Sequence, residues 1–145
     1  MPSLLKKDVI KYVMGFYFSS DKKRIVLIEK IMPIWQAGKL NGVGGKVEAG
    51  ESHKEAMSRE FKEETGVNTI PNSWDEVVDY TGKGWHMKVY IAYGDVNKAR
   101  TIEEEQVGIY EVDNLPKNIM SNLKWLIPIA LQTDILPTVI VEKSK

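Results

Sequence analysis

The chain has 145 residues, the length of one ordinary domain with a core large enough to need no cross-links. Lysine plus arginine and aspartate plus glutamate total 20 each, so no overall field favours nucleic acid, a membrane surface or an acidic partner. Cysteine is absent, which excludes a disulfide scaffold, thiolate zinc ligands and a cysteine nucleophile. We therefore expect a single domain over residues 1–145.

The N-terminal stretch contains apolar residues, but lysines interrupt it and no small-residue cleavage site follows. It is therefore predicted to be neither a signal peptide nor a membrane-spanning segment. Together with the absence of cysteine, this predicts a soluble, cytoplasmic protein, monomeric or homodimeric, that binds neither membranes nor nucleic acid.

Alternating apolar residues predict a strand over residues 9–18, and a second strand follows over residues 24–31. The polar residues 19–23 between them predict a turn, so the two strands should form a hairpin. Residues 32–40 contain proline and glycine without a regular period, which predicts a loop leading into a glycine-rich segment. This loop carries Trp35, a large apolar residue that is costly to expose.

The helix with the clearest boundaries is predicted over residues 53–65. Ser52 stands at the N-cap position, and Glu55 three residues later completes the pattern of a capping box. Gly66 follows the last helical residue, where a left-handed C-cap favours glycine. Start and stop signals therefore agree on the same segment.

The second half of the chain is predicted to hold several strands and one helix. The strands, in chain order, cover residues 76–81, 85–93, 106–112 and 138–141. Either Ser121 or Asn122 can cap the helix, which runs to Leu131 and tolerates Pro128 near its first turns. No repeat or inter-domain linker interrupts this order.

Three glutamates of the predicted helix, Glu60, Glu63 and Glu64, are spaced so that their carboxylates lie on one stripe. Their charges repel unless solvent, basic partners or bound cations compensate for them. One interpretation is a solvated acidic face; the other is a site for Mg2+ or Mn2+, which prefer oxygen ligands. Arg59 can orient a carboxylate through a forked contact, and Glu51 can reach back toward the same cluster.

The spacing of these residues favours the cation site. From Gly45 to Val67 the chain follows the pattern G-x5-E-x7-R-E-U-x-E-E-x-G-U, where U is apolar. At average residue frequencies, its fixed positions should coincide by chance at roughly one start in 10^8. The segment matches the Nudix box, with the apolar Phe61 where an aliphatic residue is usual, so the chain resembles a Nudix hydrolase.

The resemblance implies the Nudix fold, an α/β/α sandwich around a central mixed β-sheet, with the box forming a loop, a helix and a loop. It also implies magnesium-dependent hydrolysis of a nucleoside diphosphate linked to another group, with Mn2+ able to replace Mg2+. By the same resemblance Glu60, Glu63 and Glu64 are metal ligands, joined by the main-chain carbonyl of Gly44. Either Glu60 or Glu64 can be the general base, because that role varies among Nudix hydrolases.

A further metal-binding carboxylate from outside the helix is expected by the same resemblance. Aligning the strand that ends near Asp113 selects Glu104, or Glu103 or Glu105 if the register shifts. Lys46 is placed to reach a substrate phosphate, although an exposed strand lysine would have the same sequence.

Outside the box the chain is similar to the MutT-type branch, especially enzymes that hydrolyse oxidised purine nucleoside triphosphates. This similarity covers most of the chain and rests on the runs WQAGKLNGVGGKVEAGE, YEVDNLP and WLIPIALQ. In that branch an aromatic residue and an asparagine line the base pocket, which here correspond to Trp35 and Asn41. Trp35 can stack on a base, worth about 1–3 kcal/mol, and Asn41 can donate and accept hydrogen bonds together. Asn122 stands where the oxidised-purine enzymes carry an aspartate-bearing loop, so preference for an oxidised base stays open.

The expected substrate is a nucleoside triphosphate, hydrolysed to a monophosphate and pyrophosphate. Two alternatives remain: hydrolysis of ADP-ribose, a dinucleoside polyphosphate or another nucleotide conjugate, and a module that binds a nucleotide without hydrolysing it. The intact box favours an enzyme over such a module. Capped RNA is not expected, because the chain has no basic tail or patch to hold an RNA body.

Overall fold

The structure of the protein, a computed structural model, describes residues 9–132 and 137–143. Its strands form one mixed sheet: β1 Ile10–Phe18, β2 Arg24–Glu29, β3 Leu40–Asn41, β4 Val43–Lys46, β5 Asp75–Gly82, β6 Trp85–Tyr93, β7 Val107–Glu111 and β8 Thr138–Val141. The strand order is β3-β2-β1-β6-β5-β8, with β4 also paired to β1 and β7 to β2. The pairs β1–β6 and β5–β8 are parallel, and the other pairs are antiparallel.

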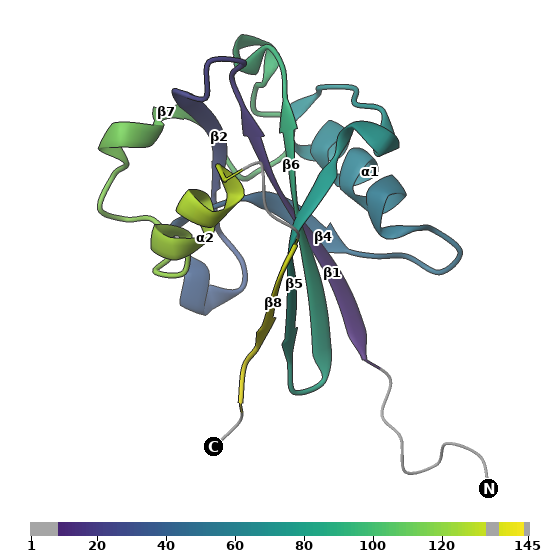
Figure 1. Ribbon diagram of the computed structural model, residues 1–145. Coiled ribbons are helices and arrows are strands. Elements are labelled where there is room, and N and C mark those ends of the chain that lie inside the picture. The colour runs from purple at the N-terminus through teal and green to yellow at the C-terminus, as the bar shows by residue number, and fades with distance from the viewer. Residues whose placement is uncertain (1–8, 133–136, 144–145) are drawn as a thin grey trace, which may run out of the picture.

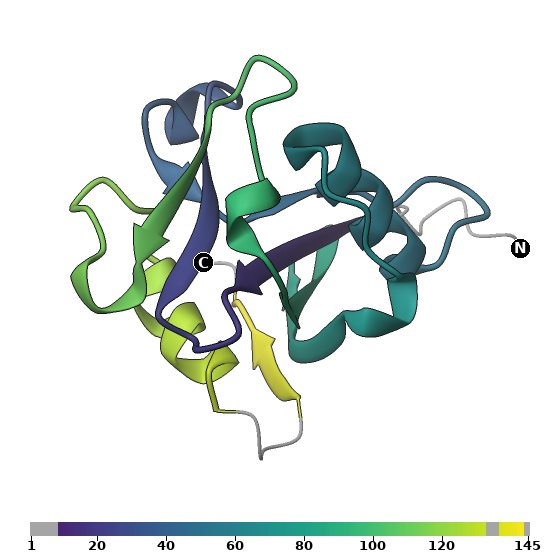
Figure 2. The ribbon, with the colours of Figure 1, turned by 90° about the horizontal axis from the view of Figure 1, so that it is seen from above.

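Two helices, α1 His53–Thr65 and α2 Leu123–Ala130, cover opposite sides of this sheet (Figures 1 and 2). Short 3-10 turns complete the described chain: η1 Ile34–Gln36, η2 Pro71–Ser73, η3 Val96–Lys98 and η4 Val112–Asn114. The predicted α/β/α sandwich with a central mixed sheet is confirmed. None of the helices in the described residues has the length and apolar character to cross a bilayer.

Strand β1 lies at the centre of the sheet and supplies both hydrophobic cores, because its successive side chains point to opposite faces. Met14, Phe16 and Phe18 belong to the core under α2. Val13 and Tyr17 belong to the core under α1. The alternation seen in the sequence therefore describes a strand buried on both faces, not one with a solvated side.

An aromatic cluster anchors α1 to the sheet. The rings of Tyr17 and Phe61 lie 4.8 Å apart, and those of Phe61 and Trp74 lie 5.3 Å apart. Phe61 and Trp74 are fully buried. Each aromatic pair contributes about 0.5–1.5 kcal/mol beyond its buried area, so the bulky residue at the apolar box position holds the helix firmly.

The hairpin of β1 and β2 opens soon after its turn. The two strands pair at Tyr17–Val26 and Phe18–Ile25, after which β4 takes the place beside β1, from Gly15–Val43 to Tyr12–Lys46. Leu40, the last residue of the predicted loop 32–40, and the glycine-rich segment that follows it therefore contain the strands β3 and β4, which were not predicted. β3 has only two residues and β4 contains two glycines in four residues, and their hydrogen-bond partners come from β1 and β2, so local sequence gives no strand signal.

The other sequence-based boundaries were close. Helix α1 is confirmed over residues 53–65, with Ser52 and Glu55 forming the capping box and Gly66 the left-handed C-cap. Strand β2 ends at Glu29, two residues before the predicted end, because the chain turns there into the Trp35 loop. Asn122 is the N-cap of α2, but its side chain makes no capping hydrogen bond. The predicted N-terminal features of residues 1–8 lie outside the described residues.

Candidate active site

Arg59 on α1 gathers the acidic side chains around it. Its Nε and Nη2 donate to the two carboxylate oxygens of Glu51 over 2.9 and 2.7 Å. Nη1 donates to Glu60 over 2.7 Å and to Glu63 over 3.2 Å. Nη2 also donates to the main-chain carbonyl of Lys46 over 3.0 Å, which ties α1 to β4. The planar fork of arginine makes these contacts possible together.

Glu51 is the structural partner in this set, not a free carboxylate. One of its oxygens also accepts a hydrogen bond of 2.9 Å from the main-chain amide of Glu48. Hydrogen bonds from Arg59 are the main reason why the pKa of Glu51 is lowered, and they outweigh the effect of burial. Glu51 therefore stays ionised and fixes the loop that leads into α1 against the arginine.

The glycines before the helix make room for the Glu60 carboxylate. A Cβ atom on Gly45 would lie 2.2 Å from Oε2 of Glu60. A Cβ atom on Gly44 would lie 2.0 Å from the carbonyl oxygen of Val13 on β1. Both distances are far inside normal contact, so glycine at position 44 lets β4 lie against β1, and glycine at position 45 leaves room for the Glu60 carboxylate where it now lies. Burial raises the pKa of Glu60, although Arg59 lowers it in part.

Glu64 is the most perturbed acid of the cluster. Burial, and after it the charge of nearby Glu60, raise the pKa of its carboxyl to about 8, while Lys30 acts in the opposite sense. Its Oε2 is buried without a hydrogen-bond partner among the described residues. A buried carboxylate oxygen without a donor is costly. A cation would remove that cost.

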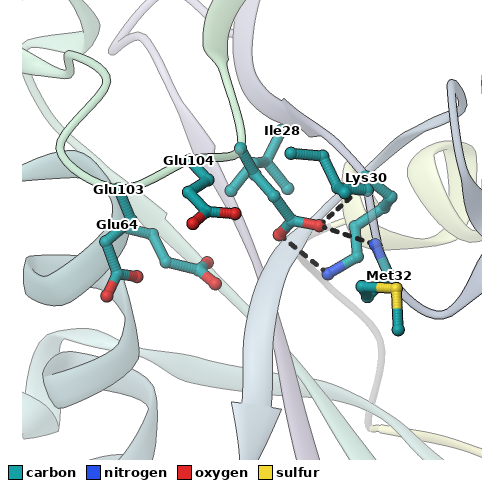
Figure 3. Close-up of a pocket in the computed structure, with 8 residues that line it drawn as sticks. Ile28, Lys30, Met32, Glu64, Glu103 and Glu104 are labelled. Atoms are coloured by element: carbon teal, nitrogen blue, oxygen red, sulfur yellow. Dashed lines mark hydrogen bonds and ion pairs between the residues drawn. The ribbon is translucent and has the colours of Figure 1, made fainter.

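Beside Glu64 lies a pocket of about 400 Å³ (Figure 3). It is lined by Ile28, Lys30, Ile31, Met32, Glu64, Glu103, Glu104 and Glu105. Figure 3 shows Glu103 and Glu104 on the same side of this pocket as Glu64, although they come from the loop before β7. Glu104, the expected outside carboxylate, and its alternatives Glu103 and Glu105 therefore all line the pocket that Glu64 lines. The charge of Glu103 is one of those that raise the pKa values of Glu60 and Glu64.

Glu105, the neighbouring acid, makes different contacts. It accepts hydrogen bonds from Lys30 Nζ over 3.1 Å and from the main-chain amides of Ile31 and Met32 over 2.6 and 3.4 Å. Burial alone would raise the pKa of Glu105, but the hydrogen bonds from Ile31 and Lys30 lower it below its usual value. Its carboxylate is therefore committed to the chain after β2, which leaves Glu103 and Glu104 to face Glu64.

The donor set around the pocket suits a hard divalent cation, because all its charged donors are carboxylate oxygens. The unpartnered oxygen of Glu64 fits such an ion, and the absence of a Cβ atom at Gly45 lets the Glu60 carboxylate lie against β4. Within residues 9–132 and 137–143, however, no three acidic or histidine side chains already converge closely enough to hold a metal. Glu63, for example, is paired with Arg59. Binding would therefore draw the carboxylates of the helix and the loop together.

The loop between β2 and β3 presents Trp35 to solvent, with 67% of the residue exposed. Gln36 beside it accepts a hydrogen bond of 3.2 Å from the Asn41 side-chain amide. The Asn41 oxygen in turn accepts from the amide of Gly42 over 2.9 Å. Asn41 keeps one amide hydrogen and one lone pair beyond these bonds, so it still has the capacity to recognise a base edge.

Two other predicted substrate residues occupy separate places. Lys46 has an exposed side chain at the end of β4, while its carbonyl binds Arg59. Asn122 begins α2, and its Oδ1 is buried without a partner among the described residues. The segment before Asn122 is bonded to β3, since the amide of Met120 donates to the carbonyl of Leu40 over 2.9 Å. That contact ties the start of α2 to the strand that carries Asn41.

A family profile described as the NUDIX domain matches residues 11–126. This range includes β1, the whole box helix and the acidic loop. The chain belongs to the Nudix family.

Relatives of this Nudix chain agree with that assignment. An oxidized purine nucleoside triphosphate hydrolase of Danio rerio is 31% identical over 102 residues, which cover 66% of this chain and 65% of that protein. A structure from a study of MutT from Aliivibrio salmonicida and Vibrio cholerae has a TM-score of 0.69 at 24% identity, covering 86% of this chain and 99% of the other. A Nudix hydrolase from Nitrosomonas europaea has a TM-score of 0.76 at 14% identity, covering 95% and 81%. At these identities the solved structures show a shared fold.

The Nudix box of this chain holds most of the predicted site residues together. Arg59 joins Glu51, Glu60 and Glu63 directly. Glu64 and Glu104 share one pocket. Trp35, Asn41 and Asn122 lie outside that pocket's lining.

Sequence reasoning missed two residues that shape this site. Lys30 is the basic side chain of the pocket, and Glu48 lies 3.4 Å from the guanidinium of Arg59. Neither belongs to the box pattern. Lys30 carried one usable signal, a charged residue next to Glu29 near the end of the predicted strand 24–31, after four consecutive apolar residues. Trp125 on α2 is 37% exposed, and its ring packs against that of Tyr80.

Proposed function

We propose that this Nudix protein is a pyrophosphohydrolase that converts a nucleoside triphosphate to a monophosphate and pyrophosphate, using Mg2+. The buried, unpartnered oxygen of Glu64, facing a pocket that Glu103 and Glu104 also line, carries this proposal. An acidic face that only meets solvent would not bury a carboxylate without a donor. The purine nucleotide activity named for the Danio rerio relative supports the substrate class.

The proposed metal ligands are carboxylates of α1 and of the acidic loop, together with one main-chain carbonyl: Glu60, Glu63, Glu64, Glu104 and Gly44. Mg2+ bound there would neutralise the diphosphate and activate a water for in-line attack, and Mn2+ would serve as a substitute. Arg59 holds Glu60 and Glu63 in position, and Glu51 fixes the orientation of Arg59. Either Glu60 or Glu64 accepts the proton of that water.

On the substrate side we assign the base to the Trp35 loop and the phosphates to the box. Trp35 is exposed and available for stacking, and Asn41 retains hydrogen-bonding capacity beside it. The unpartnered Oδ1 of Asn122 is suited to accept a hydrogen bond from a base donor. Lys46 is exposed at the end of β4, where its ammonium group can meet a phosphate.

The test is a nucleotide panel with product identification. Purified protein is incubated with Mg2+ and canonical or oxidised nucleoside triphosphates, ADP-ribose and a dinucleoside polyphosphate. We expect a monophosphate and pyrophosphate from a triphosphate, and Glu63→Gln should lower kcat/KM at least about a hundredfold. Lys62→Gln, an exposed change on the same helix turn, should leave it near wild type.

The outcomes separate the alternatives. Turnover only of ADP-ribose or a dinucleoside polyphosphate would move the substrate class without changing the site. Tight metal-dependent binding with no product from any compound would identify a nucleotide-binding module and overturn the proposal. Equal slow release by wild type and Glu63→Gln would show that this site is not catalytic.

A further inference from the structure

Two loops meet above the pocket, and Figure 2 shows them side by side. The first, which we call the acidic loop, is residues 102–106 before β7; the second, the Trp35 loop, is residues 30–39 after β2. In Figure 2 the acidic loop lies between α1 and the Trp35 loop. Both loops adjoin the same pair of strands, because β7 runs antiparallel to β2 as far as Ile28–Val107. The acidic loop leads into β7 at the end where the Trp35 loop leaves β2.

Glu105 is the side chain that joins these loops beyond the end of the ladder. One oxygen accepts from Lys30 and the other from the amides of Ile31 and Met32. The side chains of Glu105 and Lys30 are only 17% and 19% exposed, so this ion pair is shielded from solvent. Hydrogen bonds to a charged, partly buried acceptor are stronger than neutral ones, so the contact holds the loops in one arrangement.

Hydrogen bonds also join the two ends of each loop, so a displacement of one end is transmitted to the other end. In the acidic loop the amide of Val107 donates to the Thr101 hydroxyl over 2.9 Å. In the Trp35 loop the backbone of Lys30 closes the base: its amide donates to Lys39 and its carbonyl accepts from Gly38, both over 2.8 Å. Lys30 thus holds its own loop by its backbone and the acidic loop by its side chain.

We propose that Glu105 is a positioning residue that couples cation binding by the acidic loop to the order of the Trp35 loop. This inference rests on the proposed function, which makes Glu104 a metal ligand and Trp35 the residue that stacks on the base. A cation that draws Glu104 toward Glu64 also fixes Glu105, the next residue, and Glu105 fixes the amides at the start of the Trp35 loop. Metal loading would thereby prepare the base site before the nucleotide arrives.

The first test measures amide hydrogen exchange by NMR in wild type, Glu105→Gln and the control Glu29→Gln, each with and without Mg2+. The informative amides are Ala37, Gly38 and Lys39, which do not touch Glu105 and whose acceptors lie within the Trp35 loop. In wild type we expect Mg2+ to slow their exchange about threefold or more. Glu105→Gln should speed metal-free exchange about tenfold and abolish the response to Mg2+.

The control and the contrary results are defined by the same measurement. Glu29 is an exposed carboxylate at the end of β2, so Glu29→Gln should behave as wild type. Exchange in Glu105→Gln that matches wild type, or that still responds to Mg2+, overturns the coupling. A wild-type Trp35 loop that ignores Mg2+ overturns it as well.

The second test separates positioning from general destabilisation. Glu105→Gln should raise KM for the nucleoside triphosphate about tenfold while kcat changes less than about threefold, and adding Trp35→Ala should bring little further loss. Additive losses in the double variant, or a fall confined to kcat, would contradict the inference. If wild type hydrolyses no nucleotide, the proposed function is wrong, while the exchange experiment still decides whether Glu105 couples the loops.

Discussion

At the scale of single residues, the glutamates of the site differ in burial and hydrogen bonding, and these differences give them different pKa values and roles. Glu51 and Glu105 accept several hydrogen bonds, and their pKa values are lowered. Glu60 and Glu64 lie deeper, and burial raises the pKa of each. Glu51 and Glu105 therefore hold Arg59 and the loops in place, and the carboxylates of Glu60 and Glu64 are the candidate cation ligands. Residue type alone does not separate these roles, since all four are glutamates.

The substitution Glu64→Gln is predicted to change the pH dependence of stability. In the folded state the pKa of Glu64 is about 8, above its ordinary value of 4.5. Its neutral form is therefore favoured by folding, and wild type should lose stability as pH rises from about 4.5 to 8. Each pKa unit corresponds to about 1.4 kcal/mol, so the variant should exceed wild type at pH 8 without metal by at least about 1 kcal/mol.

Urea denaturation of both proteins at pH 5 and pH 8, in chelator, measures this effect. Adding Mg2+ should then stabilise wild type more than Glu64→Gln, because the variant has lost one carboxylate ligand. Parallel loss of stability in the two proteins between these pH values would contradict the assignment of the perturbed pKa to Glu64.

The substitution Arg59→Lys keeps the charge but removes the fork. Lysine cannot bind both oxygens of Glu51 and also reach Glu60 and the carbonyl of Lys46. We expect a loss of about 1–3 kcal/mol in the free energy of unfolding and a fall in kcat/KM of about tenfold or more. Lys62→Arg, an exchange of the same two residue types at an exposed position of α1, is the matched control. Equal effects of the two substitutions would mean that the forked contacts carry no special weight.

At the scale of elements, α1 owes its place to two kinds of contact. Its apolar side, with Met57 and Phe61, is fully buried against the sheet. Its acidic side meets β4, where glycine replaces side chains that would collide with Glu60. Packing holds the apolar side of α1 on the sheet, and the glycines of β4 leave room on its acidic side. The helix can therefore keep its carboxylates close to β4 without a steric clash.

The substitution Gly45→Ala is predicted to leave the fold intact and to weaken metal binding. The new Cβ would lie 2.2 Å from Oε2 of Glu60, at the end of a flexible side chain, so the carboxylate moves away from its position beside Arg59 while the backbone stays in place. Calorimetric titration with Mg2+ or Mn2+ should show an affinity lower by about tenfold or more. Gly108→Ala is the control, because its Cβ also meets the end of a side chain, that of Tyr110, on a strand away from α1. Unchanged affinity in Gly45→Ala would exclude Glu60 as a ligand.

At the scale of the whole molecule, one sheet separates two cores and strand β1 belongs to both. Met14 and Phe16 lie in the core under α2, and Val13 and Tyr17 in the core under α1. Neither helix layer can keep its packing if β1 leaves the sheet. The acidic loop and the Trp35 loop extend from the same sheet, so the site depends on both halves.

The metal-free protein is therefore predicted to unfold in one transition, with equal calorimetric and van't Hoff enthalpies. Phe61→Leu on the α1 side and Leu126→Ala on the α2 side should each lower the free energy of unfolding by about 1–4 kcal/mol. Each substitution should therefore lower the Tm of that same transition. Differential scanning calorimetry is the measurement. Two resolved transitions, with each substitution shifting only one of them, would show independent halves.

The sequence by itself determined the elements whose signals are local. The capping box and Gly66 delimit α1, alternating apolar residues mark β1 and β6, and the spacing of the box glutamates indicates the Nudix family. These features depend on neighbours within a few positions, so one sequence contains enough information to predict them. The box residues were nominated on the same basis, whereas Glu104, with Glu103 and Glu105 as alternatives, came from the family resemblance and the register of a later strand.

Only the tertiary structure decided what depends on residues far apart in the chain. It made strands of the glycine-rich residues 40–46, because β1 and β2 supply their partners. It bonded Glu105 to the amides of the Trp35 loop and left Glu103 and Glu104 on the lining of the pocket beside Glu64, a distinction that three consecutive glutamates do not reveal. Burial, desolvation and hydrogen-bond geometry are properties of the packed chain, and they divide chemically identical carboxylates into structural residues and candidate metal ligands.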